Sequence, residues 1–229
     1  MVTLIGMGSG SWEALSVQAQ DAVRRAGLVF GAKRLLAGLP PECTARQFAL
    51  YQPAEILETL AQAPGQDAAV LYSGDTGFYS GAGALCRALD AAGTPYTVEP
   101  GVSSVQLLAA ALGRPWQDWQ LVSAHGCACD PVAACQKGVP TFFLTGGSET
   151  PATLCARLAA AGYGEVIATV GENLGSDAQR LVTDTVAALA QQQFAPLSVL
   201  LAERCPAPPR RAPGLPDEVF LRGNTPMTK

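Results

Sequence analysis

Short apolar runs alternate with longer mixed stretches along most of the chain, and this alternation predicts strands followed by helices. In the first half, apolar runs typical of buried strands occupy residues 2–6, 28–30, 68–73 and 94–98. Stretches with helical spacing follow them, at 17–26, 54–63, 79–92 and 105–112. Because the connecting loops are short, the pattern favours a parallel sheet covered by helices, which is an α/β fold.

The segment 113–119, GRPWQDW, interrupts this pattern, and we expect a domain boundary there. The prediction is an N-terminal α/β domain over 1–114 and a C-terminal α/β domain over 115–205. The second half is predicted to contain strands and helices at 120–124, 141–145, 151–161, 166–170, 185–192 and 198–202. Residues 180–185 are expected to pair as an antiparallel strand, and the proline-rich stretch 206–229 is expected to be an extended tail or linker.

Composition narrows the class of protein. The chain has 229 residues, of which 48% are hydrophobic and 15% charged, which suits a well-buried domain pair and argues against disorder. The net charge of −4 argues against nucleic-acid binding, and the apolar runs are too short to cross a membrane. The N-terminal residues carry no signal-peptide pattern, and the odd count of seven cysteines favours free thiols in the cytoplasm.

Three loops rich in small residues follow predicted strands and are candidates for ligand contact. The first, GMGSG, contains Gly8 and Ser9, and its glycines allow close approach of a ligand to the backbone. A dinucleotide fingerprint would need a different glycine spacing, although Lys33 and Arg34 leave an NADP-binding oxidoreductase as an alternative. An ordinary structural turn is the other alternative for this loop.

The second loop, SGDTGFYSG, contains Asp75 directly after a predicted buried strand. In parallel sheets, ligands bind beyond the carboxyl ends of the strands, so Asp75 is placed to accept hydrogen bonds from a ligand. The alternative is that Asp75 caps the helix predicted to begin near Tyr79. The third loop holds Ser103 and Ser104, which either cap the next helix or offer hydroxyl and N–H groups to a ligand.

Taken in order, the stretches GMGSG, GAKRLL, SGDTGFYS, GVSSVQLL, SAHG, FFLTGG and GENLGS resemble the tetrapyrrole methylases that use S-adenosylmethionine. The resemblance covers residues 2 to about 202. It implies two α/β domains with the cofactor in the cleft between them, commonly in a homodimer. It also implies methylation of a late corrin precursor at C5, in precorrin-6B or cobalt-precorrin-7, in cobalamin biosynthesis. Another regiospecificity in the same family is an alternative.

The same resemblance implies which residues form the cofactor site. They are Gly8, Ser9, Ser73, Gly74, Asp75, Phe78, Ser103, Ser104, Thr145 and Leu174. The tetrapyrrole substrate carries carboxylates, so local cations are expected to bind it, with Arg34 preferred because its guanidinium can grip a carboxylate bidentately. The other candidates are Lys33, Arg114 and Arg180, and each of the four is equally consistent with a solvated surface charge.

His125 and Glu172 are the candidates for accepting the ring proton. An imidazole can accept and release a proton near neutral pH, and His125 is the only histidine of the chain. The spacing of His125, Cys127, Cys129 and Cys135 is a poor match to a zinc site, so no metal is expected and a metal-binding module stays an alternative. Finally, the tail is similar to a segment that leads into a C15-methylating decarboxylase, so a fused or separate decarboxylase is an expected partner.

Overall fold

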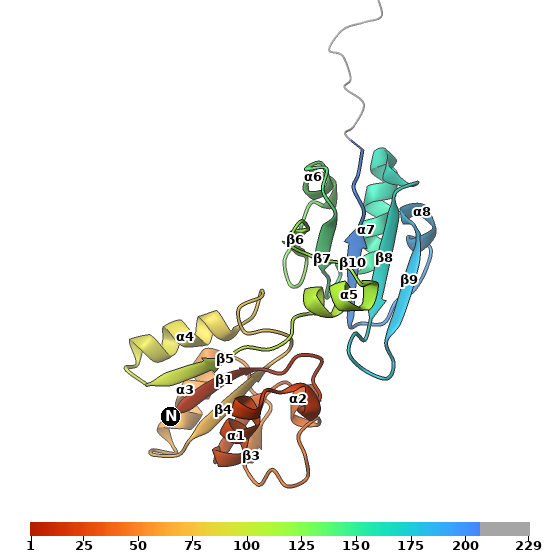
Figure 1. The fold of residues 1–229 in the computed structure, drawn as a ribbon. Coiled ribbons are helices and arrows are strands. Elements are labelled where there is room, and N and C mark those ends of the chain that lie inside the picture. The colour runs from red at the N-terminus through yellow and green to blue at the C-terminus, as the bar shows by residue number, and fades with distance from the viewer. Residues whose placement is uncertain (207–229) are drawn as a thin grey trace, which may run out of the picture.

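Two five-stranded sheets organise the computed structural model, which describes residues 1–206 (Figure 1). The first sheet has the strand order β3-β2-β4-β1-β5, and all its neighbouring strands are parallel, as predicted. Its strands are β1 (Val2–Gly6), β2 (Leu28–Gly31), β3 (Arg46–Phe48), β4 (Ala68–Tyr72) and β5 (Tyr96–Glu99).

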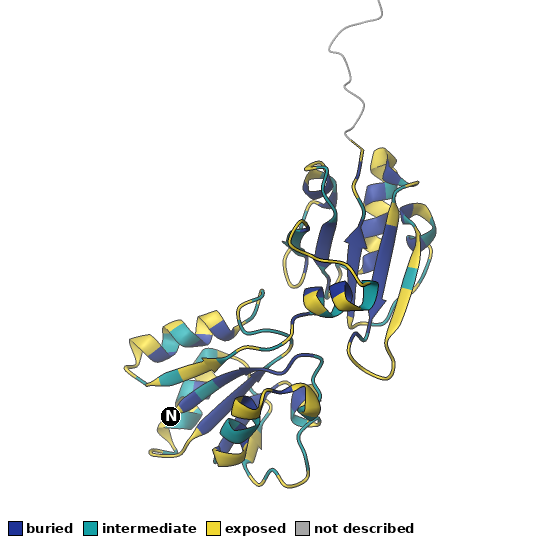
Figure 2. Ribbon diagram, in the orientation of Figure 1, coloured by how far each residue is buried: buried dark blue, intermediate teal, exposed yellow. Residues whose placement is uncertain are grey.

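Helices cover both faces of the first sheet, which explains why its central strands are apolar at consecutive positions. Leu4 of β1 packs with helices on one face, and Ile5 packs with helices on the other. The helices on the Leu4 face are α3 (Pro53–Ala61) and α4 (Ala82–Ala91), and those on the Ile5 face are α1 (Val17–Arg25) and α2 (Lys33–Leu36). Figure 2 shows the buried strands between these helices as a dark layer.

The second sheet has the order β6-β7-β10-β8-β9 and is mixed rather than parallel. Only β6 and β7 are parallel, and the other three pairings are antiparallel, including the predicted antiparallel strand at 180–185. The strands are β6 (Gln120–Ser123), β7 (Thr141–Leu144), β8 (Ile167–Glu172), β9 (Arg180–Thr185) and β10 (Ser198–Ala202).

One face of the second sheet packs against α5 (Ser104–Leu112), which lies on the side toward the first domain (Figure 1). The opposite face is covered by α6 (Pro131–Cys135), α7 (Pro151–Leu158) and α8 (Val186–Leu189). Phe142 and Phe143 of β7 are fully buried on these two opposite faces. The domain limits at residues 114 and 205 stay predictions, and the predicted tail, apart from Pro206, lies outside the described residues.

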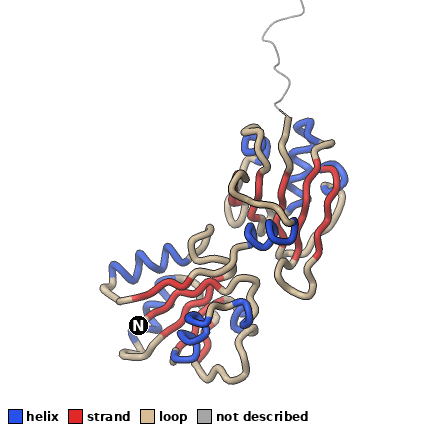
Figure 3. The backbone as a smooth tube through the Cα atoms, viewed as in Figure 1, coloured by secondary structure: helices blue, strands red, loops and turns tan. Residues whose placement is uncertain are grey.

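The sequence patterns missed β3, α2 and α6, which are three to five residues long and too short to show a period. The predicted helix at 79–92 begins later than expected, at Ala82 after the N-cap residue Gly81, and the Ser80 hydroxyl accepts a hydrogen bond from the Ala82 N–H. The preceding loop is therefore longer than expected, as the tube in Figure 3 shows. Among residues 1–206, no helix is long and apolar enough to cross a membrane.

Candidate functional site

A cavity of about 260 Å³ lies between the two domains, where the carboxyl ends of β1 and β4 face α5 and the second sheet. All ten residues predicted to bind the cofactor line it, together with Arg34 and His125. The complete lining is Gly8, Ser9, Arg34, Ser73, Gly74, Asp75, Phe78, Tyr79, Ser103, Ser104, Leu107, His125, Leu144, Thr145, Gly171, Asn173, Leu174, Ser176, Pro196, Leu197, Ser198 and Val199. The structure thus gathers residues that are up to 191 positions apart in the sequence.

The floor of the cavity is bare backbone from two glycine turns. Gly8 and Gly74 exchange hydrogen bonds, from the Gly8 N–H to the Gly74 carbonyl at 3.1 Å and back at 2.9 Å. Both have left-handed backbones, with φ of 56° and 68°, which favour glycine. A third chain passes beside them, since a Cβ on Gly101 would lie 2.4 Å from the carbonyl oxygens of Gly6 and Gly74. A side chain therefore has no room at Gly6 or Gly101, and the left-handed backbones at Gly8 and Gly74 leave the cavity floor as backbone without side chains.

The Asp75 carboxylate holds two of these loops together. Its Oδ1 accepts a hydrogen bond from the Gly77 N–H at 2.9 Å, and its Oδ2 accepts one from the Gly101 N–H at 3.1 Å. The alternative that Asp75 caps a helix is wrong, because α4 begins seven residues later at Ala82. Asp75 lines the cavity, but both of its oxygens are engaged by the protein backbone.

The serine pair begins α5 at the same cavity wall. Ser103 is the N-cap residue and is 4% exposed. Its backbone N–H and its hydroxyl both donate to the Gln106 side-chain oxygen, at 2.8 and 3.0 Å. The capping role of Ser103 is therefore confirmed, and Ser103 and Ser104 also lie in the cavity wall, where contact with a ligand stays a prediction.

Arg34 reaches the cavity from α2 and connects the first two loops. Its guanidinium donates to the Ser9 carbonyl at 3.1 Å and to the Ser73 hydroxyl at 2.8 Å. Partial burial of the guanidinium lowers the pKa of Arg34 from its ordinary value, without neutralising so strong a base. Two of its five N–H donors have these partners, so the remaining donors are available to an anionic group.

His125 lies on the opposite wall, where β6 ends. Its Nδ1 is 3.2 Å from the Thr145 carbonyl oxygen. A carbonyl only accepts, so Nδ1 carries the proton of the neutral ring and Nε2 carries the free electron pair. Gly146 makes this placement possible, because a Cβ there would lie 2.0 Å from Nδ1. The Thr145 hydroxyl itself donates to the Ser198 carbonyl.

The remaining predicted charged residues do not line the cavity. Arg114 forms an ion pair with Glu203. Arg180 forms one with Glu172, which is 4% exposed and also accepts a hydrogen bond from the Ala195 N–H at 2.6 Å. Burial raises the pKa of Glu172, but the hydrogen bonds from Arg180 and Ala195 outweigh it, so this pKa lies below its ordinary value. Lys33 is exposed at the start of α2.

The cysteines near His125 are dispersed. Cys127 is exposed, whereas Cys135 is buried in the second-domain core beside Cys155 and Cys205. Residues 1–206 hold no group of three histidine, cysteine or acidic side chains placed to bind a metal ion.

Several lining residues were not predicted from the sequence. Tyr79, Asn173 and Ser176 fall inside the quoted motifs SGDTGFYSG and GENLGS, but nothing in those motifs singles them out as residues of the cavity lining. Residues 196–199 carry no such signal, because they span the end of the preceding loop and the first two residues of β10, whose place in the sheet depends on antiparallel pairing.

The cavity is built from glycine turns at strand ends and is bounded by a second α/β domain, a position typical of small-molecule binding sites in two-domain proteins. Residues 1–190 match the family model of the tetrapyrrole (corrin/porphyrin) methylases. The chain therefore belongs to the tetrapyrrole methylase family.

Individual relatives agree with this assignment. The chain is 30% identical over 224 residues to a precorrin-6Y C(5,15)-methyltransferase [decarboxylating] of Mycobacterium tuberculosis, covering 96% of this chain and 56% of that protein. It is 30% identical over 206 residues to a cobalt-precorrin-7 C(5)-methyltransferase of Salmonella typhimurium, covering 89% of this chain and all of that protein. The chain thus spans about half the length of the precorrin-6Y relatives it matches.

Solved structures show the same fold. A uroporphyrin-III C-methyltransferase of Thermus thermophilus, in complex with S-adenyl homocysteine, superposes with a TM-score of 0.71 at 20% identity. The match covers 88% of this chain and 91% of that one.

Proposed function

We propose that this chain is an S-adenosylmethionine-dependent methyltransferase that acts on a late corrin precursor, at C5 of precorrin-6B or cobalt-precorrin-7, in cobalamin biosynthesis. The observation that carries the proposal is the interdomain cavity, in which the ten predicted cofactor residues lie together. Family membership and the C5-methylating relatives support the same reaction.

The cavity suits the cofactor on its own chemistry. The backbone of the Gly8 and Gly74 turns is free of side chains and can approach a polar ligand closely. Leu107, Leu144 and Leu174 supply an apolar wall for a flat heterocycle. Bound S-adenosylmethionine would supply an electrophilic methyl group on a sulfonium, leaving S-adenosylhomocysteine as the product.

The chain's own residues then have to hold and orient the acceptor carbon. Positioning two reacting atoms in line can supply a large part of the rate in such a displacement. Arg34 is assigned to a carboxylate of the substrate, because its remaining donors are at the cavity. Lys33 lies next to it on α2, while Arg114 and Arg180 would first have to leave their ion pairs.

His125 is assigned as the group that accepts the proton released from the ring carbon as the new carbon–carbon bond forms. Its Nδ1–H is held by Thr145, so Nε2 is the atom that can take the proton. Glu172 is the weaker candidate, since Arg180 and Ala195 already occupy its carboxylate. We further propose that the enzyme is a cytoplasmic homodimer and that its product passes to a fused or separate C15-methylating decarboxylase.

The proposal is tested by calorimetric titration with S-adenosylhomocysteine, followed by methyl transfer to the corrin precursor. Leu174→Trp places a large ring in the cavity and should weaken binding at least tenfold, about 1.4 kcal/mol. Leu181→Trp is the matched control, because Leu181 is an exposed leucine of the same domain outside the cavity lining.

Thermal unfolding of both variants separates a filled cavity from a misfolded domain. Absence of binding by the wild type would overturn the proposal. Methylation at another ring carbon, located by NMR, would keep the methyltransferase and replace its regiospecificity.

A further inference from the structure

Two residues among 1–206 combine a side chain with a left-handed backbone, and both line the interdomain cavity. Tyr79 has a φ of 49° and Asn173 a φ of 48°, and every other positive φ in these residues belongs to glycine. Tyr79 lies in the β4–α4 loop of the first domain, whereas Asn173 follows β8 of the second. Such backbones persist in non-glycine residues only where the surroundings fix them, and they gather at functional sites.

The contacts of Tyr79 show what fixes its backbone. Its hydroxyl donates to the Leu121 carbonyl at 3.1 Å, and Leu121 belongs to β6 of the other domain. Its ring meets the Phe78 ring edge-on, with 4.9 Å between centroids. Phe78 in turn lies 6.1 Å from the Phe142 ring in β7 and packs on the second-domain core. The β4–α4 loop is thus attached to the second domain by a hydrogen bond and an aromatic contact.

A role in core packing does not account for Tyr79. The residue is 51% exposed, so burial contributes little to keeping a tyrosine at this position. The Tyr79 hydroxyl can both donate and accept a hydrogen bond, and the contact with the Leu121 carbonyl uses only the donor. The same loop carries Ser73, which contacts Arg34, and Gly74 and Asp75, which contact the loops at Gly8 and Gly101.

We propose that Tyr79 is a positioning residue that holds the β4–α4 loop at a fixed distance from the second domain, and so aligns the methyl donor with the acceptor carbon. This inference rests on the proposed function, because both walls of the cavity have to surround the reacting atoms. The first-domain loops form the glycine floor of the cofactor site, and the Tyr79–Leu121 hydrogen bond sets how far they lie from the His125 wall. A loss of alignment lowers the rate of transfer more than it lowers cofactor affinity.

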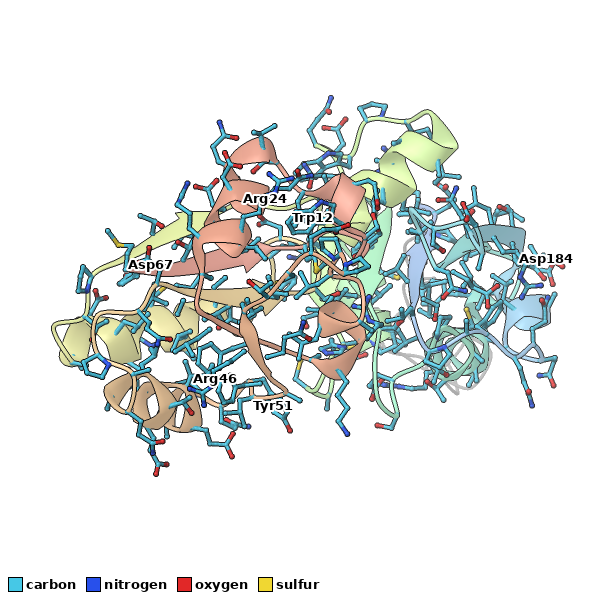
Figure 4. The ribbon with its side chains drawn as sticks, turned by 90° about the horizontal axis from the view of Figure 1, so that it is seen from below. Trp12, Arg24, Arg46, Tyr51, Asp67 and Asp184 are labelled. Atoms are coloured by element: carbon cyan, nitrogen blue, oxygen red, sulfur yellow. The ribbon has the colours of Figure 1, made fainter. Side chains whose placement is uncertain are left out.

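The test uses Tyr79→Phe, which removes the hydroxyl and keeps the ring, and Tyr79→Gly, which keeps the left-handed backbone and removes both the hydrogen bond to Leu121 and the ring contact with Phe78. Tyr51→Phe is the matched control, since Tyr51 is an exposed tyrosine on the first domain outside the cavity lining (Figure 4). We expect Tyr79→Phe to lower kcat about tenfold and Tyr79→Gly more, with the Kd for S-adenosylhomocysteine changed less than threefold. Tyr51→Phe should change neither quantity.

A ligand-free measurement keeps the inference separate from the proposed function. Amide hydrogen exchange of residues 73–81 should be faster in Tyr79→Phe than in the wild type, and unchanged in Tyr51→Phe. Unchanged exchange in Tyr79→Phe would overturn the inference even if the wild type bound no cofactor. Faster exchange with an unaltered kcat would also overturn it, because the attachment would then not position the reacting atoms. A wild type without methyl transfer would instead refute the proposed function.

Discussion

Replacing Asp75 tests whether the cavity floor must be preassembled for the cofactor to bind. Asp75→Ala removes the acceptors for two backbone N–H groups, those of Gly77 and Gly101. At about 1 kcal/mol net for each partly exposed hydrogen bond, the loss is about 2 kcal/mol, of which half lies within the β4–α4 loop, at Gly77, and half between that loop and Gly101. If binding has to restore the loop arrangement, that loss reappears as a Kd for S-adenosylhomocysteine raised about 30-fold. Asp75→Asn keeps one acceptor and should raise the Kd only about fivefold.

The assay is calorimetric titration of both Asp75 variants beside an aspartate control. Asp184→Ala is suitable, because Asp184 also accepts a local backbone hydrogen bond, at 2.7 Å from the Thr185 N–H. Figure 4 shows Asp184 at the far side of the second domain from the first. Equal affinity in the wild type and Asp75→Ala would refute the reasoning, since the loops would then hold their shape without the carboxylate. A loss of affinity in Asp184→Ala would show that the effect is general destabilisation.

Three further outcomes are expected. Gly146→Ala should displace the imidazole of His125 and lower kcat at least tenfold, with a smaller change in cofactor affinity. Single-turnover kinetics and calorimetry measure these two quantities. A kcat equal to that of the wild type would remove His125 from the proton step. Glu172→Gln should lower the Tm by about 3 °C at pH 7. This difference in Tm should disappear as the pH falls through the lowered pKa of Glu172, because the pairing with Arg180 stabilises the fold only above that pKa. A difference in Tm that stays constant down to acid pH would contradict this prediction. Arg34→Lys keeps the charge, but the lysine cannot bridge the two loops, so the cofactor Kd measured by calorimetry should rise about fivefold. An unchanged Kd would show that the loops do not need the guanidinium.

The first-domain half of the site was predictable because it follows from one rule of topology. Carboxyl ends of parallel strands meet at one sheet edge, so Ser9 and Ser73 had to lie close together once β1 and β4 were recognised. The pairing of Glu172 with Arg180 was not predictable in this way. These residues face each other through the antiparallel register of β8 and β9, and a shift of one residue would have placed them on opposite faces.

The direction of the Asp75 side chain was also beyond the sequence. Its motif marks a carboxylate at a strand end, but whether that carboxylate faces a ligand or a neighbouring turn depends on how closely the third loop approaches. The contact distances at Gly101 settle this, since the loop lies close enough to donate its N–H to Asp75. Long-range packing of this kind leaves no periodic signal in the sequence.

The position of β1 inside the first sheet has a consequence for folding during synthesis. β1 is made before both of its neighbours, so one of its edges stays unpaired until β4 (Ala68–Tyr72) has been added and the other until β5 (Tyr96–Glu99) has been added. The apolar run Val2–Gly6 is exposed for that period, when an unpaired strand is prone to aggregation. We therefore expect the nascent N-terminal domain to depend on chaperone protection more than the second domain, whose β8 and β9 are joined by a short loop and can pair as soon as they are made.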